Sequence, residues 1–116
     1  MGLIQLEEME FYAYHGHYRE EQVIGNRFLL DLSLESDMEA PGRSDELKDA
    51  VNYQEVYRLI NREMQKPSHL LEHVATRILD ALFAELPGIR HATLKISKMN
   101  PPLGGKTRSV SVTLSR

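Results

Sequence analysis

The amino-acid sequence predicts an α+β fold, because two pairs of strand-like segments flank two consecutive helix-like segments. The strand-like segments alternate apolar and polar side chains, and the helix-like segments repeat apolar side chains every three or four residues. This order, β-β-α-α-β-β, favours one four-stranded antiparallel sheet with both helices on one face. The six segments are, in chain order, residues 4–14, 27–35, 56–64, 70–86, 92–97 and 110–114.

The first strand changes its alternation halfway along. Apolar residues up to Leu6 share one face and those from Met9 onwards take the other, which indicates a β-bulge between them. His15 and Gly16 close this strand, and residues 17–22 are expected to form a polar loop or a helical turn.

The second strand alternates most regularly. Leu29 breaks its pattern, which indicates that the outer face of the sheet is partly covered. Residues 37–43 contain Pro41-Gly42 and are expected to be a connection. The inward-facing set is Phe28, Leu30, Leu32 and Leu34.

Both helices carry terminal signals. Asn52 is followed three residues later by Glu55, which fits a capping box at the start of the first helix. The second helix is expected to begin near Leu70 and to stop at Pro87-Gly88.

Length and composition limit the possible functions. A chain of 116 residues holds one core, so one domain over residues 1–116 is expected. The 14 basic and 17 acidic side chains are scattered, which argues against a nucleic-acid partner. The absence of cysteine excludes disulfides, thiolate nucleophiles and cysteine-rich zinc sites. We find no secretory signal or membrane span, and we expect a cytoplasmic protein.

One face of the predicted sheet has no helix layer. We expect that face to be half apolar and uncovered, and self-association is a common way to cover such a face, so a homo-oligomer is expected.

Lys98 shares the parity of Leu94 and Ile96 and should point toward the apolar side of the third strand. Loss of hydration lowers the pKa of a lysine ammonium toward the range useful for a general base. The alternative is that the strand ends at Ser97 and that Lys98 only extends along the surface.

Glu72 lies in the first turn of the second helix, where backbone N–H groups lack intrahelical acceptors. A carboxylate beside such donors can bind a flat ring that carries paired N–H groups and a carbonyl. The alternative is a favourable contact with the helix dipole.

Other polar residues have simpler interpretations. Tyr53 follows the helix cap and either relays protons or packs, and Glu20 and Glu21 fit solvated charges in a loop. His15 and His17 have the spacing of two metal ligands, but no third ligand is nearby, so structural turn histidines are the preferred interpretation.

Five short motifs occur in order along nearly the whole chain, and together they resemble the dihydroneopterin aldolase family, which has the tunnelling fold. The segment 104–108 departs from the commonest family sequence, as does His17-Tyr18. The motifs are Tyr14-His15-Gly16, Glu21 with Ile24-Gly25, Asn52-Tyr53, Leu70-Leu71-Glu72-His73 and Lys98-Met99-Asn100-Pro101-Pro102.

The resemblance implies cleavage of 7,8-dihydroneopterin into 6-hydroxymethyl-7,8-dihydropterin and glycolaldehyde, in folate biosynthesis. It implies that Glu72 anchors the amino-pyrimidinone edge of the pterin, with backbone help from Leu71 and Val51. Lys98 would be the acid–base group. The resemblance further implies that Tyr53 passes protons and that Glu21 orients the trihydroxypropyl tail and a water.

The resemblance also implies that Tyr53 and Val51 reach the site from a neighbouring subunit, in a four-chain ring that pairs into an octamer. No cofactor or metal is expected, because the C6=N5 imine of the dihydropterin accepts the electrons of the broken bond.

Three alternatives stay open. They are a zinc-dependent 6-pyruvoyl-tetrahydropterin synthase type, suggested by His15-Gly16-His17, a dihydroneopterin triphosphate epimerase, and a non-catalytic pterin-binding oligomer. The first usually needs a further upstream histidine and a cysteine, which this chain lacks. The last would need neither Lys98 nor Tyr53.

Overall fold

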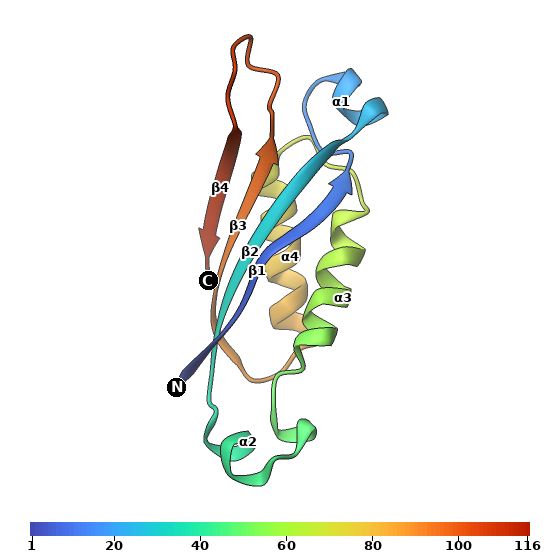
Figure 1. Cartoon of the computed structure of the whole chain (residues 1–116). Helices are drawn as coiled ribbons and strands as arrows, with labels where there is room; N and C mark the ends of the chain where they lie inside the picture. The colour runs from blue at the N-terminus through green and yellow to red at the C-terminus, as the bar shows by residue number, and fades with distance from the viewer.

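The computed structural model describes all 116 residues and contains one antiparallel sheet in the order β1-β2-β3-β4. Helices α3 and α4 pack on one face of this sheet, so the predicted α+β architecture is confirmed (Figure 1). The molecule is elongated, with extents of 53 × 23 × 20 Å. Its elements are β1 (Gly2–Ala13), α1 (Arg19–Ile24), β2 (Asn26–Ser36), α2 (Glu39–Ser44), the 3₁₀ helix η1 (Leu47–Asp49), α3 (Tyr53–Met64), α4 (Leu71–Glu85), β3 (Ile89–Met99) and β4 (Ser109–Ser115).

The core lies between the sheet and the two long helices. Every second side chain of β2 from Phe28 to Leu34 is fully buried, as the alternation predicted. Each fully buried side chain of this size contributes about 1.5–3 kcal/mol of transfer free energy. The helices supply the opposite wall of the core with Val56, Leu59, Ile60, Met64, Val74, Ala75, Ile78, Leu79 and Leu82.

The predicted bulge in β1 is confirmed. Leu6 pairs with Leu32 and Met9 with Leu30, so β1 has one more residue than β2 between these pairs. Glu8 adopts a left-handed backbone with φ 52°, and its N–H donates to Asp31 Oδ1 at 2.8 Å. The extra residue turns the apolar side chains on both sides of the bulge toward the helices.

Residues 19–22 belong to α1, which agrees with the helical turn that was one of the two expectations for residues 17–22. The expected connection at 37–43 differs from the prediction, because it overlaps α2. Pro41 is accepted there because it occupies the first turn of α2, where its missing N–H would have no intrahelical acceptor.

The cap of α3 is confirmed only in part. The Asn52 side chain accepts from the Gln54 N–H at 3.0 Å, so Asn52 is the N-cap. Glu55 does not complete a capping box, because its carboxylate binds Arg58 at 2.7 Å instead.

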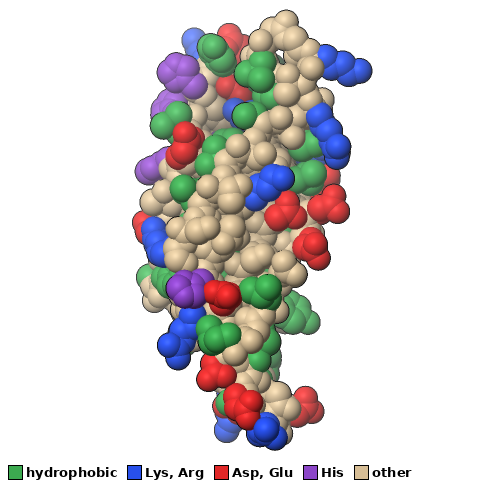
Figure 2. Space-filling model, turned by 90° about the vertical axis from the view of Figure 1, so that its left-hand side faces the viewer, with side chains coloured by type: hydrophobic (Ala, Val, Ile, Leu, Met, Phe, Trp, Pro, Cys, Tyr) green, Lys and Arg blue, Asp and Glu red, His purple; other side chains and the backbone are tan.

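The sheet face away from the helices has no covering layer in this chain, but the expectation that it is half apolar is wrong. Gln5 donates to Ser33 Oγ at 3.2 Å on this face, and Thr93 lies 3.0 Å from Ser115. Figure 2 views the molecule from its β4 edge, where backbone and uncharged polar atoms cover the middle of the surface, and it shows the outer face only side-on. Burial of apolar surface on this face therefore does not argue for an oligomer.

None of the helices is both long enough and apolar enough to cross a membrane.

Candidate active site

A cavity of about 320 Å³ lies at the end of the sheet where α1, the start of α4 and the β3–β4 connection meet. Figure 1 shows these three segments together at the top of the molecule. Four of the six predicted site residues line this cavity. They are Glu21, Leu71, Glu72 and Lys98.

Lys98 points inward from β3, as its parity predicted. The strand continues to Met99, so the alternative that it ends at Ser97 is wrong. Lys98 Nζ donates to Glu21 Oε2 at 2.6 Å, and both side chains are only 11% exposed. The pair is therefore a charge-assisted hydrogen bond that is shielded from water and opens on the cavity.

Glu21 is held in place by its own helix and by a glycine. Its Oε1 accepts from the Tyr18 N–H at 3.3 Å, and its N–H donates to the Tyr18 carbonyl at 3.1 Å. A Cβ on residue 16 would lie 2.5 Å from the Glu21 carboxyl carbon, so Gly16 makes room for this carboxyl. The expectation that Glu21 is a solvated loop charge is wrong.

Glu72 and Leu71 begin α4 and line the same cavity. Leu70 is the N-cap and provides no side-chain acceptor for the first N–H groups of the helix. The Glu72 side chain is exposed and lines the cavity. A carboxylate next to unpaired backbone donors can bind a planar ligand that offers both donors and acceptors.

Val51 and Tyr53 do not join the other predicted residues within the chain. They line a different cavity of about 510 Å³, together with Leu3 and Ser36. Along β2, Phe28 pairs with Lys98 whereas Ser36 borders this second cavity. The eight residue-to-residue steps from Phe28 to Ser36 span roughly 26 Å of strand. The two groups of site residues therefore lie at opposite ends of the sheet.

His15 is a structural histidine, as preferred from the sequence. Its ring is fully buried and its Nδ1 accepts from the Ser68 N–H at 3.1 Å. Burial and the nearby Arg77 lower the pKa of His15 to about 4, against an opposing effect of the Met64 carbonyl. His17, by contrast, is exposed and lines the cavity.

No three His, Asp or Glu side chains gather closely enough to hold a metal ion.

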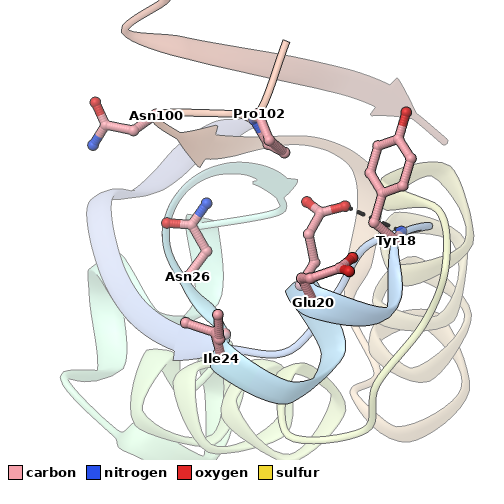
Figure 3. A pocket seen from close by; sticks show the side chains of 8 residues that line it. Tyr18, Glu20, Ile24, Asn26, Asn100 and Pro102 are labelled. Carbon is pink, nitrogen blue, oxygen red and sulfur yellow. Dashed lines mark hydrogen bonds between the residues drawn. The ribbon is translucent and has the colours of Figure 1, made fainter. Parts of the chain in front are cut away.

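A neighbouring hollow of about 420 Å³ was not predicted from the sequence (Figure 3). It shares Glu21, Tyr18 and Pro102 with the first cavity and adds Asn26 and Asn100. Asn26 Nδ2 donates to the Met99 carbonyl at 2.7 Å, and Asn100 has a left-handed backbone with φ 49°. Asparagines at strand ends were the available signal, because asparagine tolerates this backbone conformation.

Known proteins resemble this chain over its whole length. Residues 4–115 match the sequence profile of a family described as dihydroneopterin aldolase. A dihydroneopterin aldolase of Bacillus subtilis (strain 168) is 34% identical over 117 residues, covering 100% of this chain and 98% of that protein. One from Streptococcus pyogenes serotype M6 is 38% identical, with the same coverage.

The fold is also found in solved structures. The crystal structure of Escherichia coli dihydroneopterin aldolase in complex with neopterin has a TM-score of 0.91 at 21% identity, covering 100% of this chain and 99% of that chain. The architecture here is therefore the tunnelling fold of those structures. With residues 4–115 matched and relatives above 30% identity along its full length, the chain belongs to the dihydroneopterin aldolase family.

Proposed function

We propose that this protein cleaves 7,8-dihydroneopterin into 6-hydroxymethyl-7,8-dihydropterin and glycolaldehyde, as a cytoplasmic enzyme of folate biosynthesis. The observation that carries the proposal is the shielded pair of Lys98 and Glu21, which opens on the same cavity as Glu72. An acid–base group and a carboxylate for the pterin thus line one cavity.

Binding of the pterin ring is assigned to the start of α4. The Glu72 carboxylate would accept from the amino group and ring N–H of the pyrimidinone, and the backbone of Leu71 would bind the same edge. The neopterin bound to the Escherichia coli enzyme of the same fold supports a pterin ligand.

The chemistry is a retro-aldol reaction. A base removes the proton of the 2′-hydroxyl, the C1′–C2′ bond breaks, and its electron pair moves into the C6=N5 imine to give an enamine. Protonation of C1′ then yields the hydroxymethyl product. Lys98 is positioned beside Glu21 to exchange these protons, and Tyr53 would pass them to and from the intermediate. Glu21 would orient the tail and a water.

Tyr53 and Val51 have to reach this site from another chain. Their place at the opposite end of the sheet supports a site shared between subunits. The Tyr53 residue is 62% exposed in this single chain. Such exposure is expected of a residue that completes the site of a neighbouring chain. We propose the four-chain ring and its pairing into an octamer on this basis.

Epimerisation at C2′ is the second candidate activity. The same bond cleavage followed by recombination on the other face of the aldehyde would invert C2′. The hollow next to Glu21 offers room in which a released fragment can turn.

The test is to incubate the purified protein with 7,8-dihydroneopterin and to follow glycolaldehyde and the C2′ epimer separately. Lys98→Ala should remove both products. Lys95→Ala is the matched control, because Lys95 lies on the same strand but is exposed on the outer face. Wild-type protein that binds dihydroneopterin without forming either product would contradict the enzymatic proposal and favour the non-catalytic oligomer.

A further inference from the structure

The segment between α3 and α4, residues 65–70, decides where the pterin-binding end of the cavity lies. His69 and Leu70 line the cavity, and Leu70 caps the helix that begins with Leu71 and Glu72. A shift of this α3–α4 segment therefore shifts Glu72 relative to Lys98.

Ser68 in the middle of this segment is held from two sides. Its N–H donates to His15 Nδ1 at 3.1 Å, and its carbonyl accepts from the Gly16 N–H at 2.9 Å. Its hydroxyl accepts from Arg77 Nη2 at 2.8 Å. All three hydrogen-bonding groups of a nearly buried serine are thus used.

Arg77 connects the α3–α4 segment to the body of the two helices. Its Nη2 also donates to the Lys66 carbonyl at 2.8 Å, and its Nη1 donates to Glu63 Oε1 at 2.9 Å. Burial alone would raise the pKa of Glu63, but hydrogen bonds from Lys66, Arg62 and Arg77 outweigh it and lower that pKa. The carboxylate therefore stays ionised as the partner of Arg77.

His15 connects the same segment to the catalytic end. Nδ1 has to be unprotonated to accept from Ser68, so the neutral ring carries its proton on Nε2. The ring packs edge-on against Phe28 at 5.3 Å between centroids, and Phe28 pairs with Lys98. The next residue, Gly16, leaves room for the Glu21 carboxyl, since a Cβ there would lie 2.5 Å from the carboxyl carbon.

We propose that His15 and Arg77 are positioning residues, which act through Ser68 to hold Glu72 at the correct separation from Lys98 and Glu21. Neither side chain lines the cavity. The inference rests on the proposed function for its catalytic consequence, whereas the hydrogen bonds that it invokes belong to the fold.

Two substitutions of His15 separate positioning from packing. His15→Asn places an amide oxygen near the position of Nδ1 and keeps the acceptor for Ser68, at the cost of ring packing. His15→Phe keeps the ring volume and removes the acceptor. We expect His15→Phe to raise KM and the Kd for neopterin by roughly tenfold, with a smaller change in kcat. His15→Asn should change KM and the Kd for neopterin by no more than about threefold, even if its melting temperature is lower than that of wild type.

Arg77→Met should raise KM in the same way, and Arg58→Met is its matched control. Arg58 also forms an ion pair with a glutamate, Glu55, but on the exposed side of α3. Amide hydrogen exchange over residues 68–72 gives a readout that does not depend on turnover, and it should accelerate in His15→Phe and Arg77→Met only.

Equal KM values for His15→Phe and His15→Asn at equal folded fraction, or unchanged exchange in His15→Phe, would overturn the inference. If wild-type protein neither binds neopterin nor cleaves dihydroneopterin, the proposed function fails. The exchange measurement then still decides whether His15 and Arg77 hold the segment.

Discussion

Lys98 and Glu21 are 77 positions apart in the sequence and meet through a 2.6 Å hydrogen bond at the rim of a cavity. Removal of one partner leaves the other charge unpaired where water cannot hydrate it. In buried pairs this lowers the free energy of unfolding by about 3–5 kcal/mol. We therefore expect Lys98→Met to lower the free energy of unfolding markedly and kcat by roughly 10²–10⁴-fold. The double variant Lys98→Met/Glu21→Gln should regain much of the stability and none of the activity. Denaturant unfolding and product assays on the same samples test this, and a double variant as unstable as Lys98→Met would contradict it.

Glu72→Gln should weaken binding and leave folding intact. Its carboxylate is exposed, so the change in unfolding free energy should stay within about 0.5 kcal/mol. Loss of a charge-assisted hydrogen-bond pair should raise the Kd for neopterin by roughly tenfold to a hundredfold. Fluorescence titration with neopterin measures this. Unchanged affinity would show that the pterin edge is held elsewhere.

Mixed assemblies test whether the site is shared. Lys98→Ala and Tyr53→Phe should each be nearly inactive, and co-refolded mixtures should recover about a quarter of the wild-type sites, because each interface draws its two chains independently. A mixture of Lys98→Ala and Glu72→Gln is the matched control. Both of these residues line one cavity of one chain, so no hybrid site is intact and the mixture should show no more than the summed activities of the two variants. Recovery no greater than the sum of the separate activities in the first mixture would place the whole site in one chain.

His15 should make stability depend on pH. Its pKa is about 4 in the folded chain and 6.5 when the ring is freely hydrated, so between these values the unfolded state binds a proton that the folded state does not. The free energy of unfolding should therefore fall as pH drops from 6.5 to 4, by about 3 kcal/mol in total. The difference between wild type and His15→Phe, measured by denaturant at several pH values, isolates this contribution from the carboxylates. A constant difference across the range would contradict it.

Lys98 should never become attached to the substrate, because the pterin itself supplies the imine that accepts the electrons. Borohydride added during turnover should leave the mass of the protein unchanged. A mass increase located at Lys98 would replace the proposed mechanism with one through an enzyme-bound imine.

Much of the fold follows from alternation alone. The change of parity between Leu6 and Met9 predicted the bulge, and the parity of Lys98 predicted its inward direction. The helix α2 was missed because Pro41-Gly42 is typical of a turn, and only its position in the first turn makes the proline acceptable. The outer face of the sheet was wrongly predicted to be half apolar. That prediction relied on Leu29 and took too little account of the polar residues on either side of it.

The candidate site could be predicted less completely. Glu21 fits a solvated charge by every local criterion, and its partner lies on a distant strand, so only the family resemblance singled it out. The grouping of Glu21 with Lys98, and the separation of Tyr53 from both, depend on how the strands pair, and residue spacing does not contain that information.

The location of Tyr53 and Lys98 at opposite ends of one chain has a consequence for stoichiometry. If sites are shared as proposed, the number of complete sites equals the number of chain–chain interfaces and not the number of chains. Two chains joined once hold one site and two unused halves, and an open row always has one site fewer than it has members. Only in a closed ring is every half-site part of a complete site. Activity per chain would then report ring closure, and it should fall on dilution before any chain unfolds.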